Sequence, residues 1–222
     1  MIFFDIDNTL VDYSTSEKKA INSIMKSYKI RIEDYAKIWK DISSKYFSQY
    51  LLKNLSFEEQ GSMRIMDFFR AGNKIISFEK SKIIFYEYKT QLETSWMLFD
   101  DVKTCLDRLN EEEKGIASNG EMSQQNNKIQ VTNIEKYFVV QKYASEMNIA
   151  KPDYYFFEKL KKYSSNNKYI YVGDDLITDI CPCLDLGISA IWLNRNNGDV
   201  PPNVISINSL NELPHLLPLL DI

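Results

Sequence analysis

The residues at the start of the chain that can do chemistry are two aspartates that end an apolar run. The segment FFDIDNTL, residues 3–10, contains Asp5 and Asp7 two positions apart. In an extended backbone such side chains point to the same side. A carboxylate can attack phosphorus and form an aspartyl-phosphate, which divides one difficult hydrolysis into two easier steps. The pair therefore suits phosphoryl transfer, with Asp5 as the nucleophile and Asp7 as the general acid for the leaving group.

Later segments supply polar residues that could complete this site, and these residues are Ser118, Asn119, Gly120, Lys151, Asp174 and Asp179. Asp5 and Asp174 together make an all-oxygen site suited to Mg²⁺, which keeps several of its waters. Lys151 would add positive charge beside the phosphoryl oxygens. Ser118 and the backbone N–H groups around Asn119 and Gly120 would donate hydrogen bonds to the same oxygens.

Short apolar runs and helical patterns alternate over most of the chain and must position these residues. We expect strands at 2–6, 115–117, 138–140, 169–172 and 189–193, and helices at about 101–111, 123–132, 153–164 and 178–186. This alternation predicts an α/β fold with a parallel sheet and helices on both faces. In such a sheet, ligands bind beyond the carboxyl ends of the strands. Each polar segment named above follows a predicted strand, so all of them are expected at one end of the sheet.

The stretch 14–94 differs because only helical periodicity is visible in it. Helix ends are indicated by capping-box spacing at Ser14/Glu17 and Ser56/Glu59, by a stop at Gly72 and by a start at Ser77. We therefore expect a helical domain at 14–94, inserted into a discontinuous α/β domain at 1–13 and 95–222. Within it, Tyr35, Trp39, Tyr46 and Phe47 could stack on a base, but helical spacing favours a core role.

The composition limits the classes of molecule that this protein is expected to bind. The formal net charge is −4, with 27 Lys and Arg against 31 Asp and Glu, and this balance gives no surface for a nucleic-acid polymer. No apolar run reaches the roughly 18 residues of a membrane span, and no signal peptide is recognisable. The three cysteines contain no C-x-x-C pattern, which argues against a disulfide framework or a zinc site. We expect a cytoplasmic protein acting on a small phosphorylated metabolite, with no membrane partner; its oligomeric state does not follow from the sequence.

The motifs, taken in order, resemble those of the haloacid dehalogenase superfamily of phosphohydrolases. DIDNT matches the first motif, SNG at 118–120 the second, Lys151 the third and GDDLITD at 173–179 the fourth. The resemblance implies a Rossmann-like core of five parallel strands in the order 3-2-1-4-5. It also implies that the helical insertion is a cap, as in the first subclass of the family. Mg²⁺ would be held by Asp5, Asp174 and the main-chain carbonyl of Asp7, with Asp179 in support.

The segment LSFEEQGSMRIMDFF, residues 55–69, resembles the nucleotidase-like branch of that family, which implies a nucleoside 5′-monophosphate phosphatase. Other functions use the same residues. A sugar phosphomutase returns the phosphoryl group to the sugar, and a non-catalytic binder or aspartyl-phosphate switch keeps the fold without rapid turnover. A dehalogenase is disfavoured because Asp7 is present. A calcium loop starting at Asp5 is excluded by Leu10 and Ser16 at its sixth and twelfth positions. The role of Asp175 stays open.

Overall fold

The computed structural model describes residues 1–164 and 167–220 and divides the chain into two compact units. The sheet unit comprises Met1–Asp12 and Met97–Ile222, and the helical unit comprises Tyr13–Trp96. The sheet unit is therefore built from two separate stretches of sequence. We describe each unit by itself.

The sheet unit contains a six-stranded parallel sheet within the described part of the chain. The strand order is β3-β2-β1-β4-β5-β6. The strands are β1 (Ile2–Phe4), β2 (Lys114–Ser118), β3 (Val140–Tyr143), β4 (Ile170–Gly173), β5 (Ser189–Leu193) and β6 (Ile205–Ile207). The predicted order of the first five strands is confirmed. The prediction missed β6, a three-residue edge strand, and placed β3 too early because residues 135–137 form a 3-10 turn, η1 (Glu135–Tyr137).

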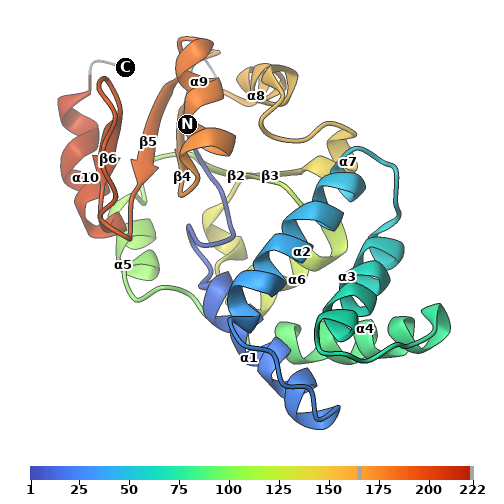
Figure 1. The fold of residues 1–222 in the computed structure, drawn as a ribbon. Coiled ribbons are helices and arrows are strands. Elements are labelled where there is room, and N and C mark those ends of the chain that lie inside the picture. Colours follow the sequence, from blue (N-terminus) through green and yellow to red (C-terminus); the bar gives the residue numbers. More distant parts are fainter. Residues whose placement is uncertain (165–166, 221–222) are drawn as a thin grey trace. The chain divides into compact units, whose positions relative to one another are not determined.

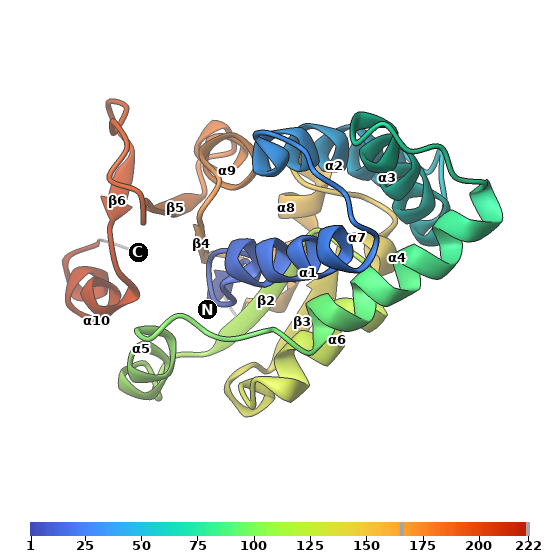
Figure 2. The same cartoon turned by 60° about the horizontal axis from the view of Figure 1, so that its bottom comes forward.

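Helices cover both faces of this sheet. They are α5 (Val102–Arg108), α6 (Met122–Val131), α7 (Ala144–Met147), α8 (Tyr154–Leu160), α9 (Cys181–Asp185) and α10 (Leu213–Leu216), with 3-10 turns η2 (Lys161–Tyr163), η4 (Leu210–Glu212) and η5 (Leu217–Leu219). Figure 2 shows α5, α6 and α10 on one side and α8 and α9 on the other. The helix predicted at 178–186 is two elements, the π-helical η3 (Leu176–Ile180) followed by α9. Pro182 lacks the N–H that a continuous α-helix would need there.

The first strand is the centre of the sheet. Ile2, Phe3 and Phe4 are all buried, and β1 pairs with β2 on one side and β4 on the other. The ring of Phe3 packs edge-on against Tyr169 with centroids 5.1 Å apart. Each such side chain contributes about 1.5–3 kcal/mol of burial free energy. Burial on all sides fixes the end of β1 firmly, and this end carries Asp5.

The helical unit consists of α1 (Tyr13–Ser27), α2 (Tyr35–Leu51), α3 (Phe57–Ala71) and α4 (Phe78–Glu93), seen in blue to green in Figure 1. Helix α4 packs on α1 and α3, and α2 packs on α3. Trp39 is buried against Phe68 and Tyr88, so its predicted core role is confirmed. Tyr46 is also buried. No described helix in either unit is both long and apolar enough to cross a bilayer.

Most predicted helix ends of this unit are confirmed. Ser56 and Glu59 form a reciprocal capping box on α3, Ser77 caps α4, and Gly72 ends α3. The Ser14/Glu17 prediction is wrong because α1 already begins at Tyr13, which places Ser14 inside the helix. Glu17 instead accepts hydrogen bonds from Arg64 at 3.2 Å and from Tyr88 at 3.3 Å. The arginine is buried and lies over the Trp39 ring, so this ion pair joins the half-buried Glu17 to the bundle core.

Candidate active site

The proposed nucleophile lies where β1 ends. Asp5 is 6% exposed, and its backbone N–H donates to the carbonyl of Val172 in β4 at 2.9 Å. Asp5 directly follows the last residue of β1, so its carboxylate sits at the carboxyl edge of the sheet. Since β1 lies between β2 and β4, strands flank this position on both sides. That edge is where an open parallel sheet binds its ligands.

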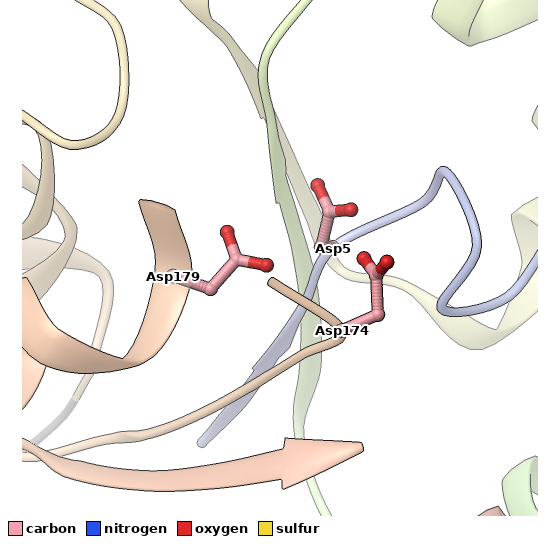
Figure 3. A group of neighbouring side chains, drawn as sticks. All are labelled: Asp5, Asp174 and Asp179. Atoms are coloured by element: carbon pink, nitrogen blue, oxygen red, sulfur yellow. The ribbon is translucent and has the colours of Figure 1, made fainter. Parts of the chain in front are cut away.

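Two further carboxylates meet Asp5 at this edge, as Figure 3 shows. Carboxylate oxygens of Asp5, Asp174 and Asp179 lie within 4.8 Å of one another. Asp174 follows β4 and accepts from the hydroxyl of Thr9 at 3.3 Å, while Asp179 projects from η3. At Gly173, a Cβ would stand 2.3 Å from Oδ2 of Asp179. A glycine is therefore needed there for Asp179 to approach the other acids.

Lys151 lies against two of these acids. Its Nζ donates to Asp5 at 2.7 Å, to Asp179 at 2.6 Å and to the hydroxyl of Tyr171 at 2.8 Å. The Lys151 side chain is 3% exposed. Burial alone would lower the pKa of Lys151, but the charges of Asp179 and Asp5 outweigh it and hold the pKa above its ordinary value. Tyr171 in turn donates to the carbonyl of Ala117 at 2.6 Å, which fixes the hydroxyl that supports the lysine.

The three acids outnumber the single ammonium group of Lys151, and the pKa values of two of the acids are raised. Burial, together with the charges of Asp5 and Asp179, raises the pKa of Asp174 to about 8. Burial also raises the pKa of Asp179 to about 6, although Lys151 acts in the opposite direction. Three crowded carboxylates beside one lysine leave excess negative charge in a poorly solvated place. Their oxygen-only donor set is the kind that a hard divalent cation such as Mg²⁺ binds, so the residues present fit this ion.

The second predicted segment, SNG at 118–120, follows β2 and is hydrogen-bonded to the third, Lys151. Ser118 ends β2 and is buried. The side-chain amide of Asn119 donates to the carbonyl of Lys151 and accepts from its N–H, both at 2.9 Å. The Asn119 side chain therefore holds the Lys151 backbone in place. Gly120 has a φ of +131°, a conformation that residues with a side chain rarely adopt.

Asp7 lies two residues beyond Asp5 and contacts helix α6. Lys128 donates to its Oδ1 at 2.6 Å, and Gln125 donates to its Oδ2 at 3.1 Å. The sequence reasoning missed both partners, together with Thr9 and Tyr171. The only trace of them in the sequence is a glutamine and a lysine three positions apart in the helix that follows the second motif. Helical spacing of this kind places two side chains on one face.

The structure also answers the open question about Asp175. Its Oδ1 accepts from the N–H groups of Ile177 at 3.0 Å and Thr178 at 2.7 Å, so it caps η3. The N–H of Asp175 donates to Oδ2 of Asp179 at 3.2 Å. Asp175 thus orients the segment that presents Asp179 to the other acids.

The sequence of the chain also matches a known protein family. The family described as haloacid dehalogenase-like hydrolase matches residues 2–193. The chain therefore belongs to this family and is a hydrolase by descent. The four segments named in the sequence analysis all lie within the matched range.

Among curated relatives, the pyrimidine 5′-nucleotidase PynA of Streptococcus pneumoniae is 27% identical over 210 residues, which cover 88% of this chain and 84% of the relative. The human N-acylneuraminate-9-phosphatase is 27% identical over 248 residues, covering 99% and 94%. Both relatives are named for removing phosphate from a small molecule, and their substrates differ.

Solved structures show the same fold. The putative hydrolase YfnB of Bacillus subtilis, described as bound to magnesium, superposes with a TM-score of 0.81 at 19% identity, covering 97% of each chain. The L-2-haloacid dehalogenase of Xanthobacter autotrophicus gives a TM-score of 0.76 at 15% identity, covering 98% of this chain and 99% of the other. At these identities the likeness concerns the fold alone.

Proposed function

We propose that this protein is a Mg²⁺-dependent phosphomonoesterase that works through an aspartyl-phosphate on Asp5. The observation that carries the proposal is the meeting of Asp5, Lys151, Asp174 and Asp179 at the carboxyl edge of the sheet. In this proposal the buried carboxylate of Asp5 attacks phosphorus, Lys151 offsets negative charge on the phosphoryl group, and the other two acids help to hold the cation.

The chemistry takes two steps. First, an oxygen of Asp5 attacks phosphorus, the bond from phosphorus to the ester oxygen breaks, and that oxygen takes the proton of Asp7. Then water attacks the phosphorus of the aspartyl-phosphate and gives a proton to Asp7, while the bond between phosphorus and the Asp5 oxygen breaks and leaves the carboxylate of Asp5. Inorganic phosphate leaves, and Asp5 and Asp7 return to their starting states. Lys151, Ser118 and the backbone N–H groups after Ser118 would hold the phosphoryl oxygens.

The cation has one part in this scheme. Bound by Asp5, Asp174 and the main-chain carbonyl of Asp7, with Asp179 in support, Mg²⁺ would neutralise phosphoryl charge so that an anionic nucleophile can approach. The fit of the three carboxylates to such an ion supports this assignment.

For the substrate, we propose a small phosphomonoester, with a nucleoside 5′-monophosphate as the leading candidate. Support comes from the name of the streptococcal relative and from the nucleotidase-like segment 55–69. We further propose that residues 14–94 act as a cap that selects the substrate, and that 1–13 and 95–222 form the catalytic domain. Exclusion of water from the reacting groups is a physical reason for such a cap.

The test is release of inorganic phosphate from a panel of nucleoside monophosphates and sugar phosphates, with Mg²⁺ and with EDTA. Wild type is compared with Asp5→Asn, and Asp199→Asn in an exposed loop is the matched control. We expect Mg²⁺-dependent release that Asp5→Asn abolishes and Asp199→Asn retains. Full activity of Asp5→Asn contradicts the nucleophile assignment. Isomerised ester without free phosphate indicates the mutase, and a stable phosphorylated Asp5 without turnover indicates the switch.

A further inference from the structure

The contacts of Asp7 form an arrangement that the four family motifs do not include. Helix α6 begins at Met122, shortly after the SNG segment, and carries Gln125 and Lys128 one turn apart. Gln125 is 2% exposed and Lys128 1%, so both polar side chains are placed in the interior. Leaving an amide and an ammonium group there is costly unless each has partners. The burial of Gln125 and Lys128 therefore has to be explained by the groups that they contact.

Each residue binds a different oxygen of the same carboxylate. Lys128 Nζ lies 2.6 Å from Oδ1 of Asp7, and Gln125 Nε2 lies 3.1 Å from Oδ2. Two donors on two oxygens fix both the position of the carboxyl group and the rotation of its plane. The Asp7 side chain nevertheless stays 29% exposed, so part of it remains open to an incoming molecule.

The glutamine also ties Asp7 to the second motif. Its Nε2 lies 2.7 Å from the carbonyl oxygen of Asn119 and 3.3 Å from Oγ of Ser118. All three neighbours are oxygens that can accept, so the amide must present its NH₂ group to them. Its own Oε1 is left buried without a hydrogen-bond partner among the described residues. The three acceptors around Nε2 therefore determine the orientation of the Gln125 amide, although this orientation leaves Oε1 without a hydrogen bond.

Gly120 makes room for this arrangement. A Cβ at that position would stand 2.8 Å from Nε2 of Gln125, and the φ of +131° already disfavours other residues. The glycine of the second motif therefore serves the glutamine as well as its own turn. Three elements, the loop after β1, the turn after β2 and helix α6, are joined at one amide group.

We propose that Lys128 and Gln125 are positioning residues for proton transfer by Asp7. They hold its carboxyl group in register with the phosphate-binding turn, and Lys128 stabilises the negative charge that develops on Asp7 as the proton passes to the leaving oxygen. This proposal rests on the proposed function, in which Asp7 protonates the leaving oxygen in the first step and accepts a proton from water in the second. It adds the two groups that make Asp7 effective in both.

The role predicts a dependence on the leaving group. An alkyl phosphate needs a proton on its leaving oxygen, whereas 4-nitrophenolate leaves without one. In Lys128→Met, kcat for an alkyl phosphate should fall roughly 10- to 100-fold, a part of the 10²–10⁴-fold that a positioned acid or base supplies. With 4-nitrophenyl phosphate, the variant should release one nitrophenol per enzyme at the wild-type rate and then turn over slowly, because only the second step still needs Asp7.

The experiment is rapid-mixing kinetics on both esters with Mg²⁺ present. Gln125→Met, which removes a different contact to the same carboxylate, should show the same pattern. Lys114→Met is the matched control, since Lys114 is another buried lysine of the sheet unit, 3% exposed, whose Nζ donates to the backbone carbonyls of Leu109 and Glu112. It should change the melting temperature without changing the ratio of alkyl to nitrophenyl turnover. Asp7→Asn sets the full effect of losing the acid.

The outcomes separate the two claims. Equal slowing of the nitrophenol burst and of alkyl turnover in the variants, or no slowing of either, overturns the positioning role while the phosphatase stands. If Lys128→Met does not fold, Gln125→Met decides by the same ratio. A wild type inactive on every ester overturns the proposed function, and the positioning role with it.

Discussion

Replacing Lys151 with methionine tests the charge balance of the site through stability alone. The substitution keeps most of the length of the side chain and removes an ammonium group that is 2.7 Å from Asp5 and 2.6 Å from Asp179. At an effective dielectric constant of about 20, each contact is worth about 6 kcal/mol of Coulomb attraction. Desolvation of the three ions offsets most of this attraction, so the net contribution of the two ion pairs to stability is much smaller.

Removal of one partner is a different matter because it leaves buried charge unpaired. Breaking a buried ion pair in this way costs about 3–5 kcal/mol. For a chain of this length, 1 kcal/mol corresponds to about 2–4 °C of melting temperature. We therefore expect Lys151→Met to melt roughly 6–20 °C below wild type at pH 8 in EDTA, measured by calorimetry.

The sign of the pH dependence is part of the prediction. The pKa of Asp179 is already raised to about 6, so protonation of Asp179 stabilises the fold below that pH and this stabilisation is lost as pH rises through 6. Without the ammonium, burial and the charge of Asp5 act on Asp179 alone and raise its pKa further. The penalty of Lys151→Met should consequently grow from pH 5 to pH 8.

The matched test is the double variant Lys151→Met/Asp179→Asn, which removes one of the two stranded carboxylates. It should recover a large part of the lost stability at pH 8 and little at pH 5. A penalty below about 1 kcal/mol at pH 8, or one that neither pH nor the second substitution changes, would refute the electrostatic reasoning. It would then follow that Lys151 contributes through packing.

Two other predictions concern the metal and its surroundings. Because the pKa of Asp174 is raised to about 8 and that of Asp179 to about 6, the metal-free protein should lose melting temperature from pH 5 to pH 8, and Mg²⁺ should restore more at pH 8 than at pH 5, since protons compete with the cation. Asp174→Asn should abolish the Mg²⁺ increment, and equal increments at both pH values in wild type would count against the cation site. Gly173→Ala places a methyl group 2.3 Å from Oδ2 of Asp179, so it should cost about 1–3 kcal/mol and weaken Mg²⁺ binding about 10-fold or more, as read from the Mg²⁺ dependence of phosphate release. Unchanged Mg²⁺ dependence would mean that Asp179 does not support the ion.

The sequence predicted best those features that depend on local patterns. The run at 189–193 is apolar and flanked by turn formers, and β5 has those bounds. Ser56 and Glu59 form the predicted capping box, whose two partners lie within one turn of the chain. The pair Ser14/Glu17 has the same spacing, but Glu17 faces Arg64 across the bundle, a contact that local spacing cannot reveal.

The same limit applies to the site. The motif residues could be predicted to lie together because each motif follows a predicted strand, and parallel strands bring their carboxyl ends to one edge of the sheet. Lys128 and Gln125 lie on a helix, and which face of that helix meets Asp7 depends on how α6 packs in three dimensions. In the sequence they are indistinguishable from the polar residues beside them, such as the exposed Gln130. Only their burial in the structure sets them apart.

The pairing of β1 has a consequence for the order in which the protein is made. Ile2 pairs with Lys114 and Ile170, so β1 gains its first sheet partner only when β2 has been synthesised and its second only when β4 has been synthesised. The helices of Tyr13–Trp96 are complete well before that, and their contacts are local enough to form early. A nascent or truncated chain that ends before β4 therefore has Asp5 without Lys151 or Asp174 placed around it. We therefore expect the proposed nucleophile to be surrounded by Lys151 and Asp174 only after β4 has joined the sheet, and a chain that ends before β4 to be inactive.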